Sequence, residues 1–215
     1  MSFDRVAHAY RLLETVAFGQ SLQRVRVRYL SQIARPNRVL IVGEGNGRFL
    51  CELVRLHPKI DIDCVDSSAR MLAFARDRIR RDDFESLPQI RFIHADILKW
   101  SSSHSYDLIV THFFLDCFPR HAVSAIINKF AQIATSDATW LLADFTIPAD
   151  RTLARLHAKL WLRVMYLFFR SFTGITGSEL VDPSPYLAAH RFAPLFRETW
   201  RAGLLKSELW QRTEL

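Results

Sequence analysis

Three glycines alternate with other residues in "VLIVGEGNGRFL", residues 39–50, directly after a run of apolar residues. Gly43, Gly45 and Gly47 lack a Cβ and adopt positive φ readily, so a ligand can approach their bare backbone amides. This arrangement is typical of the turn between the first strand and the first helix of nucleotide-binding folds. The sixth position of the dinucleotide fingerprint is Phe49, so the glycines alone do not identify the ligand.

Two acidic residues follow at the expected ends of the next strands. Asp66 lies where a carboxylate can accept hydrogen bonds from both hydroxyls of a ribose. Asp96, in "IRFIHADILKW", can accept a hydrogen bond from an adenine amino group while Ile97 packs on the ring. Either aspartate could instead cap a helix or lie solvated in a loop. The glycine loop and two acids at successive strand ends together favour a nucleoside site.

The elements that must position these residues alternate along the chain. Short β-branched runs predict strands at 38–42, 60–65, 90–95, 106–113 and 138–145, and helices begin near residues 48, 68 and 120. Several runs are apolar throughout, which indicates a parallel sheet covered on both faces. We therefore predict a doubly wound α/β fold in a single domain over residues 1–215.

The flanking segments complete this prediction. Residues 4–34 predict two helices broken near Gly19, the second capped by Ser21 and basic along Arg24, Arg26 and Arg28. A long helix is expected over 151–172, then a loop, and then a hairpin around Gly203. The domain is thus divided into an N-terminal helical lid (1–36), a binding core (37–147), a helical cover (148–191) and terminal strands (192–215).

These motifs resemble those of the class I S-adenosylmethionine-dependent methyltransferases over about residues 5–147. "VLIVGEGNGRFL", "IDIDCVDSSARMLAFAR", "IRFIHADILKW" and "YDLIVTHFFLDCF" are similar to the family's first four motifs. The resemblance implies a mostly parallel, seven-stranded, Rossmann-like sheet with an antiparallel last strand and S-adenosylmethionine across the strand ends. It also implies that Asp66 binds the ribose and that Asp96 and Ile97 bind the adenine.

The first motif departs from the family at Ile41, where an acid is common. Glu44, between the first two glycines, is a candidate to face the ammonium group of the cofactor, although it could also be a solvated loop carboxylate. A carboxylate here would repel a pyrophosphate, which argues against a dinucleotide. We also expect Ser67 and Thr111 to bind the cofactor.

The opening stretch "FDRVAHAYRLLE" resembles the lid helix of methyltransferases that act on quinones and similar molecules. It implies that Tyr10 reaches the cofactor, although Tyr10 could also be an ordinary aromatic residue of an amphipathic helix.

Candidate catalytic residues follow the fourth predicted strand. His112 and Asp116 lie near the expected transfer point and could remove a proton from the acceptor. His121 and Asp144 are further candidates. Each could be structural instead, with Asp116 capping the next helix and His121 exposed on its first turn.

The expected acceptor is a small, largely apolar molecule methylated at oxygen or carbon. The segment "FLDCFP" lacks the Pro-Pro-aromatic motif that can stack a flipped base, and "DPSPY" at 182–186 is interpreted as a turn, so the sequence argues against nucleic acid. RNA or protein methylation and a non-catalytic binding module remain alternatives. The helix over 151–172 could cover the sheet, line the acceptor pocket or touch a membrane surface.

Composition sets the remaining bounds. The net charge of +7 favours anionic partners without identifying one. Cys51, Cys64 and Cys117 lack CxxC spacing, which argues against a disulfide framework and a metal site. No leader or spanning segment is recognised, so we expect a cytoplasmic protein that could contact a membrane peripherally.

Overall fold

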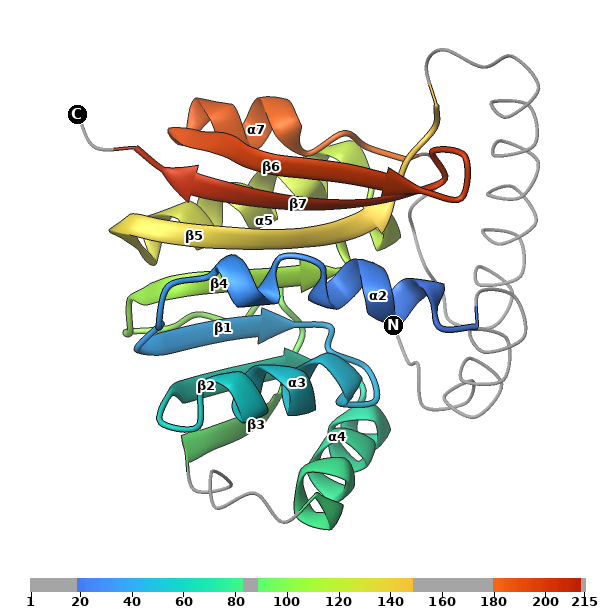
Figure 1. Cartoon of the computed structure of the whole chain (residues 1–215). Coiled ribbons are helices and arrows are strands. Elements are labelled where there is room, and N and C mark those ends of the chain that lie inside the picture. Colours follow the sequence, from blue (N-terminus) through green and yellow to red (C-terminus); the bar gives the residue numbers. More distant parts are fainter. Residues whose placement is uncertain (1–18, 83–88, 149–179, 214–215) are drawn as a thin grey trace.

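A seven-stranded sheet forms the centre of the molecule in the computed structural model, which describes residues 19–82, 89–148 and 180–213 (Figure 1). The strands are β1 (Arg38–Val42), β2 (Asp61–Asp66), β3 (Ile90–His94), β4 (Tyr106–His112), β5 (Ala134–Phe145), β6 (Phe192–Trp200) and β7 (Leu205–Arg212). Their order is β3-β2-β1-β4-β5-β7-β6. The first five strands pair in parallel, and β7 runs antiparallel to β5 and β6. The predicted fold class and the terminal hairpin are confirmed.

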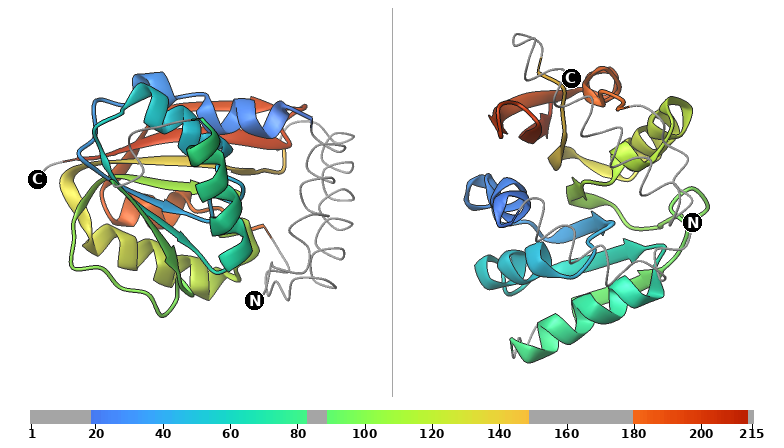
Figure 2. Two further views of the ribbon diagram at one scale, coloured as in Figure 1. Left: turned by 90° about the horizontal axis from the view of Figure 1, so that it is seen from below. Right: turned by 90° about the vertical axis from the view of Figure 1, so that its right-hand side faces the viewer.

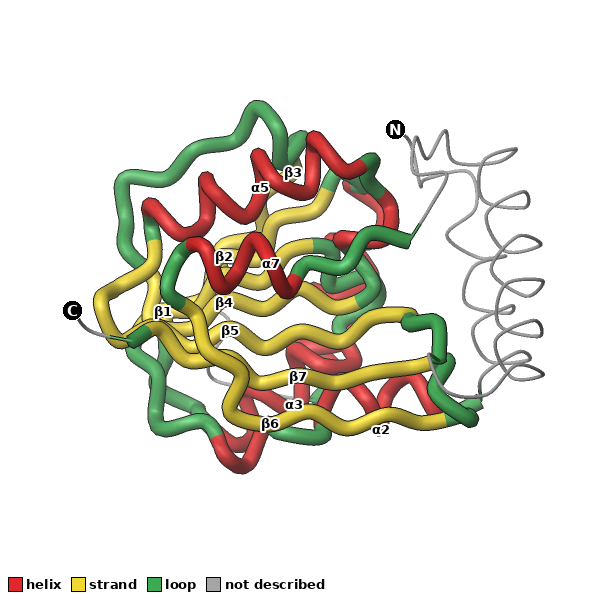
Figure 3. Tube along the Cα trace, turned by 90° about the horizontal axis from the view of Figure 1, so that it is seen from above, coloured by secondary structure: helices red, strands yellow, loops and turns green. Residues whose placement is uncertain are grey.

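Helices cover both faces of the sheet, as the wholly buried strands require. One face carries α2 (Ser21–Val27), α3 (Arg48–Leu56) and α4 (Ala69–Arg81), and the other carries α5 (Arg120–Gln132) and α7 (Ser184–Ala189) (Figures 2 and 3). Two short 3-10 helices, η2 (Leu30–Gln32) and η4 (Leu115–Cys117), follow α2 and β4. The apolar core is accordingly divided by the sheet into separate clusters on its two faces.

The strand order sets where a ligand can bind. The chain builds β1, β2 and β3 outward in one direction and then returns to place β4 on the other side of β1. The connections after β1 and β4 therefore leave the sheet in opposite directions, and in folds of this kind the ligand crevice lies outside the carboxyl ends of two such strands. The glycine loop follows β1 and the segment of His112 and Asp116 ends or follows β4, so both border this crevice.

The N-terminal region differs from its prediction in two details. Gln20, and not Ser21, precedes the first turn of α2, and the Ser21 hydroxyl instead accepts a hydrogen bond from Arg201 Nη2 at 3.2 Å. The three arginines do not share one face either. Arg24 and Arg28, one helical turn apart, are exposed, whereas Arg26 between them is buried.

Residues 182–186 also differ from their prediction. The sequence predicts a turn here, but Ser184 begins α7, with a proline in its first turn, where the missing amide is tolerated. Asp182 accepts hydrogen bonds from the Ser184 amide at 3.1 Å and from its hydroxyl at 2.7 Å. The helix predicted over 151–172 lies outside the described residues, and the division of the domain into lid, core and cover stays a prediction.

The remaining sequence expectations concern cysteines and membranes. Cys51, Cys64 and Cys117 are free thiols, and the first two are buried in the core, as small apolar residues would be. Among the helices of the described ranges, none combines the length and the apolar character needed to cross a bilayer.

Candidate active site

The glycine loop combines tight packing at its ends with open space at its centre. All three glycines have positive φ, from +68° to +80°. A Cβ on Gly43 would lie 2.7 Å from Cδ2 of Phe114, and a Cβ on Gly47 would lie 2.7 Å from the Cα of Ala75. A Cβ on Gly45 would meet no atom within 4 Å. Gly43 and Gly47 therefore permit close packing within the protein, whereas Gly45 presents bare backbone to a space that a ligand can fill.

Glu44 caps helix α3. The residue before this helix, Gly47, has no side chain with which to bind the free amides of the first turn. Glu44 Oε1 accepts hydrogen bonds from the amides of Phe49 and Leu50, both at 3.0 Å. Burial raises the pKa of Glu44 to about 7, against the opposing effects of these amides and of Arg26. The buried carboxylate thus occupies the helix terminus at which a dinucleotide fold binds phosphate.

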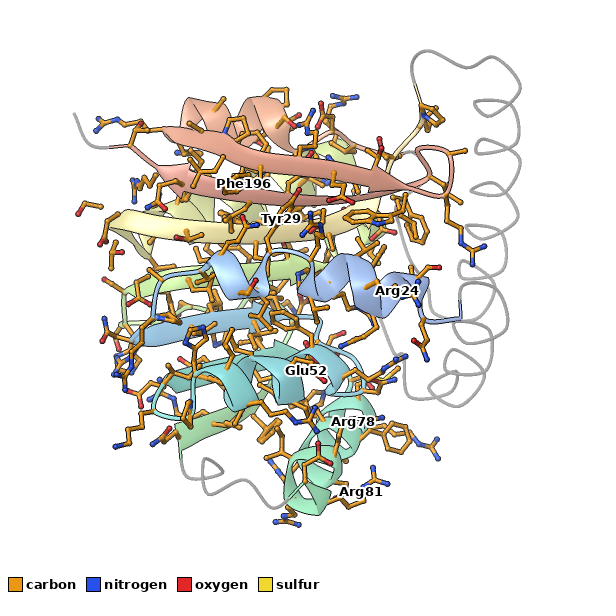
Figure 4. The ribbon with its side chains drawn as sticks, in the orientation of Figure 1. Arg24, Tyr29, Glu52, Arg78, Arg81 and Phe196 are labelled. Carbon is orange, nitrogen blue, oxygen red and sulfur yellow. The ribbon has the colours of Figure 1, made fainter. Side chains whose placement is uncertain are left out.

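Two basic side chains that the sequence analysis did not single out hold the loops in place. Arg78 of α4 donates from Nε to the carbonyl of Asn46, in the glycine loop, at 2.9 Å (Figure 4). Lys129 of α5 donates to the carbonyls of Ile97, Leu98 and Trp100, each at 2.9 Å. A basic residue inside a helix carries no sequence signal for such a role, because the partner carbonyls lie about 30 residues away in the chain.

Asp66 and Asp96 have the same local geometry at neighbouring strand ends. Asp66 Oδ1 accepts from the amide of Ser68 at 2.8 Å, and Asp96 Oδ1 accepts from the amide of Leu98 at 3.0 Å. These contacts fix the orientation of both carboxylates relative to their loops. The amide of Ala95 bonds the carbonyl of Asp66 at 3.0 Å, which joins the two strand ends.

The other residues expected to bind a cofactor lie in different surroundings. Ser67 is half-buried between Asp66 and α4, and Ile97 is buried. Thr111 is buried in β4, and its hydroxyl accepts a hydrogen bond from the indole of Trp140 at 2.9 Å, so its side chain supports the core. Tyr10 lies outside the described residues.

His112 and Asp116 belong to separate clusters. His112 is buried at the end of β4 with its ring against Phe49 of α3, at 4.5 Å between centroids. Burial lowers its pKa well below the ordinary value, and the positive charge of Arg26 lowers it further. His112 is therefore a neutral imidazole on the α3 face of the sheet. Its two ring nitrogens have no hydrogen-bond partner within the described part of the chain.

Asp116 lies in η4 and interacts electrostatically with Asp144, at the carboxyl end of β5. Burial raises the pKa of Asp116 to about 6. Burial also raises the pKa of Asp144 well above its usual range, as does the negative charge of Asp116, while Lys206 has the opposite effect. The charge of Asp116 thus disfavours the ionised form of Asp144. His121 is exposed on the first turn of α5.

Aromatic residues line the chain between these clusters. Phe113 has a φ of 50°, which is rare for a bulky residue. Its ring packs edge-on against Phe145, at 5.1 Å between centroids, and the guanidinium of Arg26 lies 5.2 Å from its centroid. Strained backbone of this kind is often found at functional sites. The two phenylalanines thus form an apolar pair that packs with Leu22 and Val25 of α2.

Metal chemistry has no candidate ligands in this region. Over residues 19–82, 89–148 and 180–213, no three His, Cys, Asp or Glu side chains lie close enough together to hold an ion.

Comparison with known proteins identifies the core of the chain. Residues 39–137 match the family described as "Methyltransferase domain". A demethylmenaquinone methyltransferase of Thermotoga maritima is 36% identical over 84 residues, which cover 38% of this chain and 37% of that protein. A trans-aconitate 2-methyltransferase of Azoarcus sp. is 33% identical over 84 residues, covering 39% of this chain and 30% of that protein. The matches thus span well under half of these relatives.

Solved structures match the fold over nearly the whole chain. The magnesium protoporphyrin IX methyltransferase of Synechocystis PCC 6803, solved with bound SAH, gives a TM-score of 0.69 at 17% identity, covering 98% of this chain and 96% of that one. This likeness extends the fold assignment beyond residues 39–137.

The glycine loop generates a first prediction. Gly47→Ala should lower the free energy of unfolding by about 3 kcal/mol, because the positive φ and the contact with Ala75 both oppose a side chain. Gly45→Ala, with similar φ but open space, should lower it by only about 1 kcal/mol. Urea denaturation of both variants measures the difference, and equal losses would contradict the packing role of Gly47.

The buried acids generate a second prediction, on pH dependence. The pKa of Asp116 is about 6 in the folded protein against an ordinary 3.8, so the folded state binds more protons between these values. Stability should therefore fall as pH rises from 4 to 7, by about 2–3 kcal/mol from this group. Asn keeps the size and the acceptor oxygen of Asp116 without the charge, so Asp116→Asn should flatten the profile.

Urea denaturation at several pH values measures this effect. Asp77→Asn, which changes an exposed carboxyl on α4, is the control and should keep the wild-type slope. An unchanged slope in Asp116→Asn would show that its ionisation is not linked to folding.

Proposed function

Because residues 39–137 match the methyltransferase-domain family, we propose that the chain binds S-adenosylmethionine and methylates a small, largely apolar acceptor at oxygen or carbon. The observation that carries the proposal is the pairing of open backbone at Gly45 with Glu44 bound to the amides of α3. The loop can receive a ligand, but the free amides at its helix terminus are already bound by an acidic side chain. A cationic sulfonium ligand fits this loop, and a pyrophosphate does not.

The residues at the strand ends would bind the nucleoside part of the cofactor. Asp66 would accept from the ribose hydroxyls, with Ser67 beside it, and Asp96 would accept from the adenine amino group, with Ile97 against the ring. Arg78 and Lys129 support this binding by holding the loops. Glu44 contributes a negative charge near the ammonium group of the cofactor, although its Oε1 is occupied by helix amides.

Catalysis follows from positioning and proton removal. Bound S-adenosylmethionine supplies an electrophilic methyl group on a sulfonium, which becomes a neutral thioether when the methyl leaves. Asp116 is the favoured proton acceptor, because a pKa of about 6 leaves it largely ionised at neutral pH and basic enough to take a proton. Phe113 and Phe145 would exclude water and contact an apolar acceptor.

A second candidate acceptor is RNA. Helix α4 begins just after Asp66 and carries exposed arginines, Arg70, Arg76, Arg80 and Arg81, on its outer side. A basic surface beside the nucleoside site would suit a phosphate backbone. The small-molecule relatives and the apolar surface at Phe113 favour the first candidate.

Calorimetry tests the cofactor. We expect S-adenosylhomocysteine to bind and NADH not to bind. Asp66→Ala should weaken S-adenosylhomocysteine at least about tenfold through lost ribose hydrogen bonds. Gly45→Ala should weaken it similarly by filling the ligand space. Asp61→Ala, at the opposite and exposed end of β2, is the matched control and should bind as wild type does. Binding of NADH in place of S-adenosylhomocysteine would reject the proposal.

Transfer of a labelled methyl group tests the acceptor. Label should pass to hydroxylated aromatic compounds such as catechols and hydroxynaphthoquinones, and not to tRNA. Asp116→Asn should lower kcat for these compounds by about 100-fold or more, through loss of general-base catalysis. Its affinity for S-adenosylhomocysteine should stay unchanged. Label in tRNA alone would favour the second candidate, and unaltered kcat in Asp116→Asn would exclude this aspartate as the base.

A further inference from the structure

The excess positive charge of the chain is concentrated in two segments. Residues 19–38, which contain α2 and η2, carry five arginines and no acidic residue, a net charge of +5. Residues 191–213, which contain β6 and β7, carry five basic and two acidic residues, a net charge of +3. The whole chain has a net charge of +7, so all the other residues together have a net charge of −1. The basic character of the protein is therefore local.

The two segments pack against each other along β6, the outermost strand of the sheet. The ring of Tyr29 stacks on Phe196 of β6, at 5.6 Å between centroids (Figure 4). Arg28 forms an ion pair with Glu198 of the same strand at 2.5 Å. The exposed residues of both segments therefore share one surface, which we call the basic edge. Its members are Arg24, Arg28, Leu195, Phe196, Arg197 and Arg201.

Two neighbouring apolar side chains are exposed within the basic edge. Leu195 is 51% exposed and Phe196 is 47% exposed, and Arg197 follows them directly. Single exposed apolar residues are common on protein surfaces, but an adjacent pair among several cations fits a partner that is both anionic and apolar. A membrane surface has both properties, because anionic headgroups cover a hydrocarbon layer.

The local structure of β6 is poorly suited to other partners. Pro194 has no amide to donate to a further strand, and a bulge between Pro194 and Phe196 interrupts the register. Pairing with the sheet edge of a second copy is therefore disfavoured. One face of the Phe196 ring is already stacked on Tyr29, and Leu195 has no ring, so the pair offers little stacking surface to the bases of RNA.

We propose that the basic edge binds the surface of an anionic membrane, with Leu195 and Phe196 inserted between the headgroups. This inference goes beyond the proposed function and uses none of the residues proposed to bind the cofactor. Charge attraction and insertion of apolar side chains are two separate contributions, and stable attachment to a membrane generally needs two. The contact would bring the protein to the phase in which an apolar acceptor dissolves.

Sedimentation with lipid vesicles tests the proposal, using the full chain without cofactor. Wild type should bind vesicles of phosphatidylcholine and phosphatidylglycerol at least about tenfold more tightly than vesicles of phosphatidylcholine alone, and added salt should weaken this binding. Arg24→Glu should weaken it by about tenfold or more, because each cation near an anionic surface adds to the affinity. Arg80→Glu makes the same charge change at an exposed position of α4, beside the opposite end of the sheet, and is the control.

A second pair of variants tests the apolar part of the surface. Leu195→Glu should weaken binding to the mixed vesicles by about tenfold or more. Leu98→Glu is the control, because Leu98 is 45% exposed and follows β3, the opposite outermost strand. All four positions are exposed, so the urea midpoints of the variants should stay close to that of wild type. Should Arg24→Glu not fold, Arg24→Gln should weaken vesicle binding to a smaller extent.

Several outcomes would overturn the proposal. Equal binding to neutral and mixed vesicles, or binding to neither, would exclude an anionic membrane as the partner. Equal losses in Arg24→Glu and Arg80→Glu would show that overall charge is responsible, and unchanged binding of Leu195→Glu would show that no side chain is inserted. Binding of RNA without vesicles, or a dimer that Leu195→Glu dissociates, would assign the basic edge to another partner. No cofactor or acceptor takes part, so these results are independent of the proposed function, which binding of S-adenosylhomocysteine tests separately.

Discussion

The hydrogen bonds from the amides of Phe49 and Leu50 to Glu44 determine what the crevice can bind. They replace the cap that Gly47 cannot provide, and so allow a helix to begin directly after a glycine loop. They also place a carboxylate where related nucleotide-binding folds accept phosphate. One side chain thus serves the stability of α3 and the selectivity of the loop. The loop geometry is shared widely among nucleotide-binding folds, and the chemistry of this cap is what distinguishes it here.

The site gathers buried charge at the carboxyl edge of the sheet. Glu44, Asp116, Asp144 and Arg26 are all buried there, and burial raises the pKa of each of these acids. Within β2, Asp63 accepts hydrogen bonds from Arg91 Nη2 at 2.8 Å and from the Tyr106 hydroxyl at 2.6 Å, so this buried acid has direct partners. Acids whose pKa is raised by burial cost stability, which is common where a site is prepared for a ligand.

The sequence was sufficient to predict the sheet, because short apolar runs that alternate with helical segments are typical of buried parallel strands. It also predicted that the glycines follow the first strand and that Asp66 and Asp96 lie where the next two strands end, as they do in the structure; their binding roles stay predictions. It could not separate Arg26 from Arg24 and Arg28, because which side of a short helix is buried depends on its tertiary neighbours. Nor could it show that His112 and Asp116, although close in the chain, have different surroundings. His112 packs against Phe49, whereas Asp116 interacts with Asp144. The prolines near 183–186 favoured a turn, yet a proline is also suited to the first turn of a helix.

The buried charge of Glu44 affects both the stability of the protein without ligand and its affinity for a charged ligand. A pKa of about 7 means that Glu44 is half protonated near neutral pH, because its charge is poorly compensated in the buried loop. A cation bound nearby would favour the ionised form and lower this pKa, so binding would be accompanied by release of a proton. The same burial that weakens the fold therefore strengthens attraction to a positively charged ligand, since charges interact more strongly where water is excluded. A solvated glutamate in this loop would have neither effect, which is why its contact with the α3 amides matters for function as well as for folding.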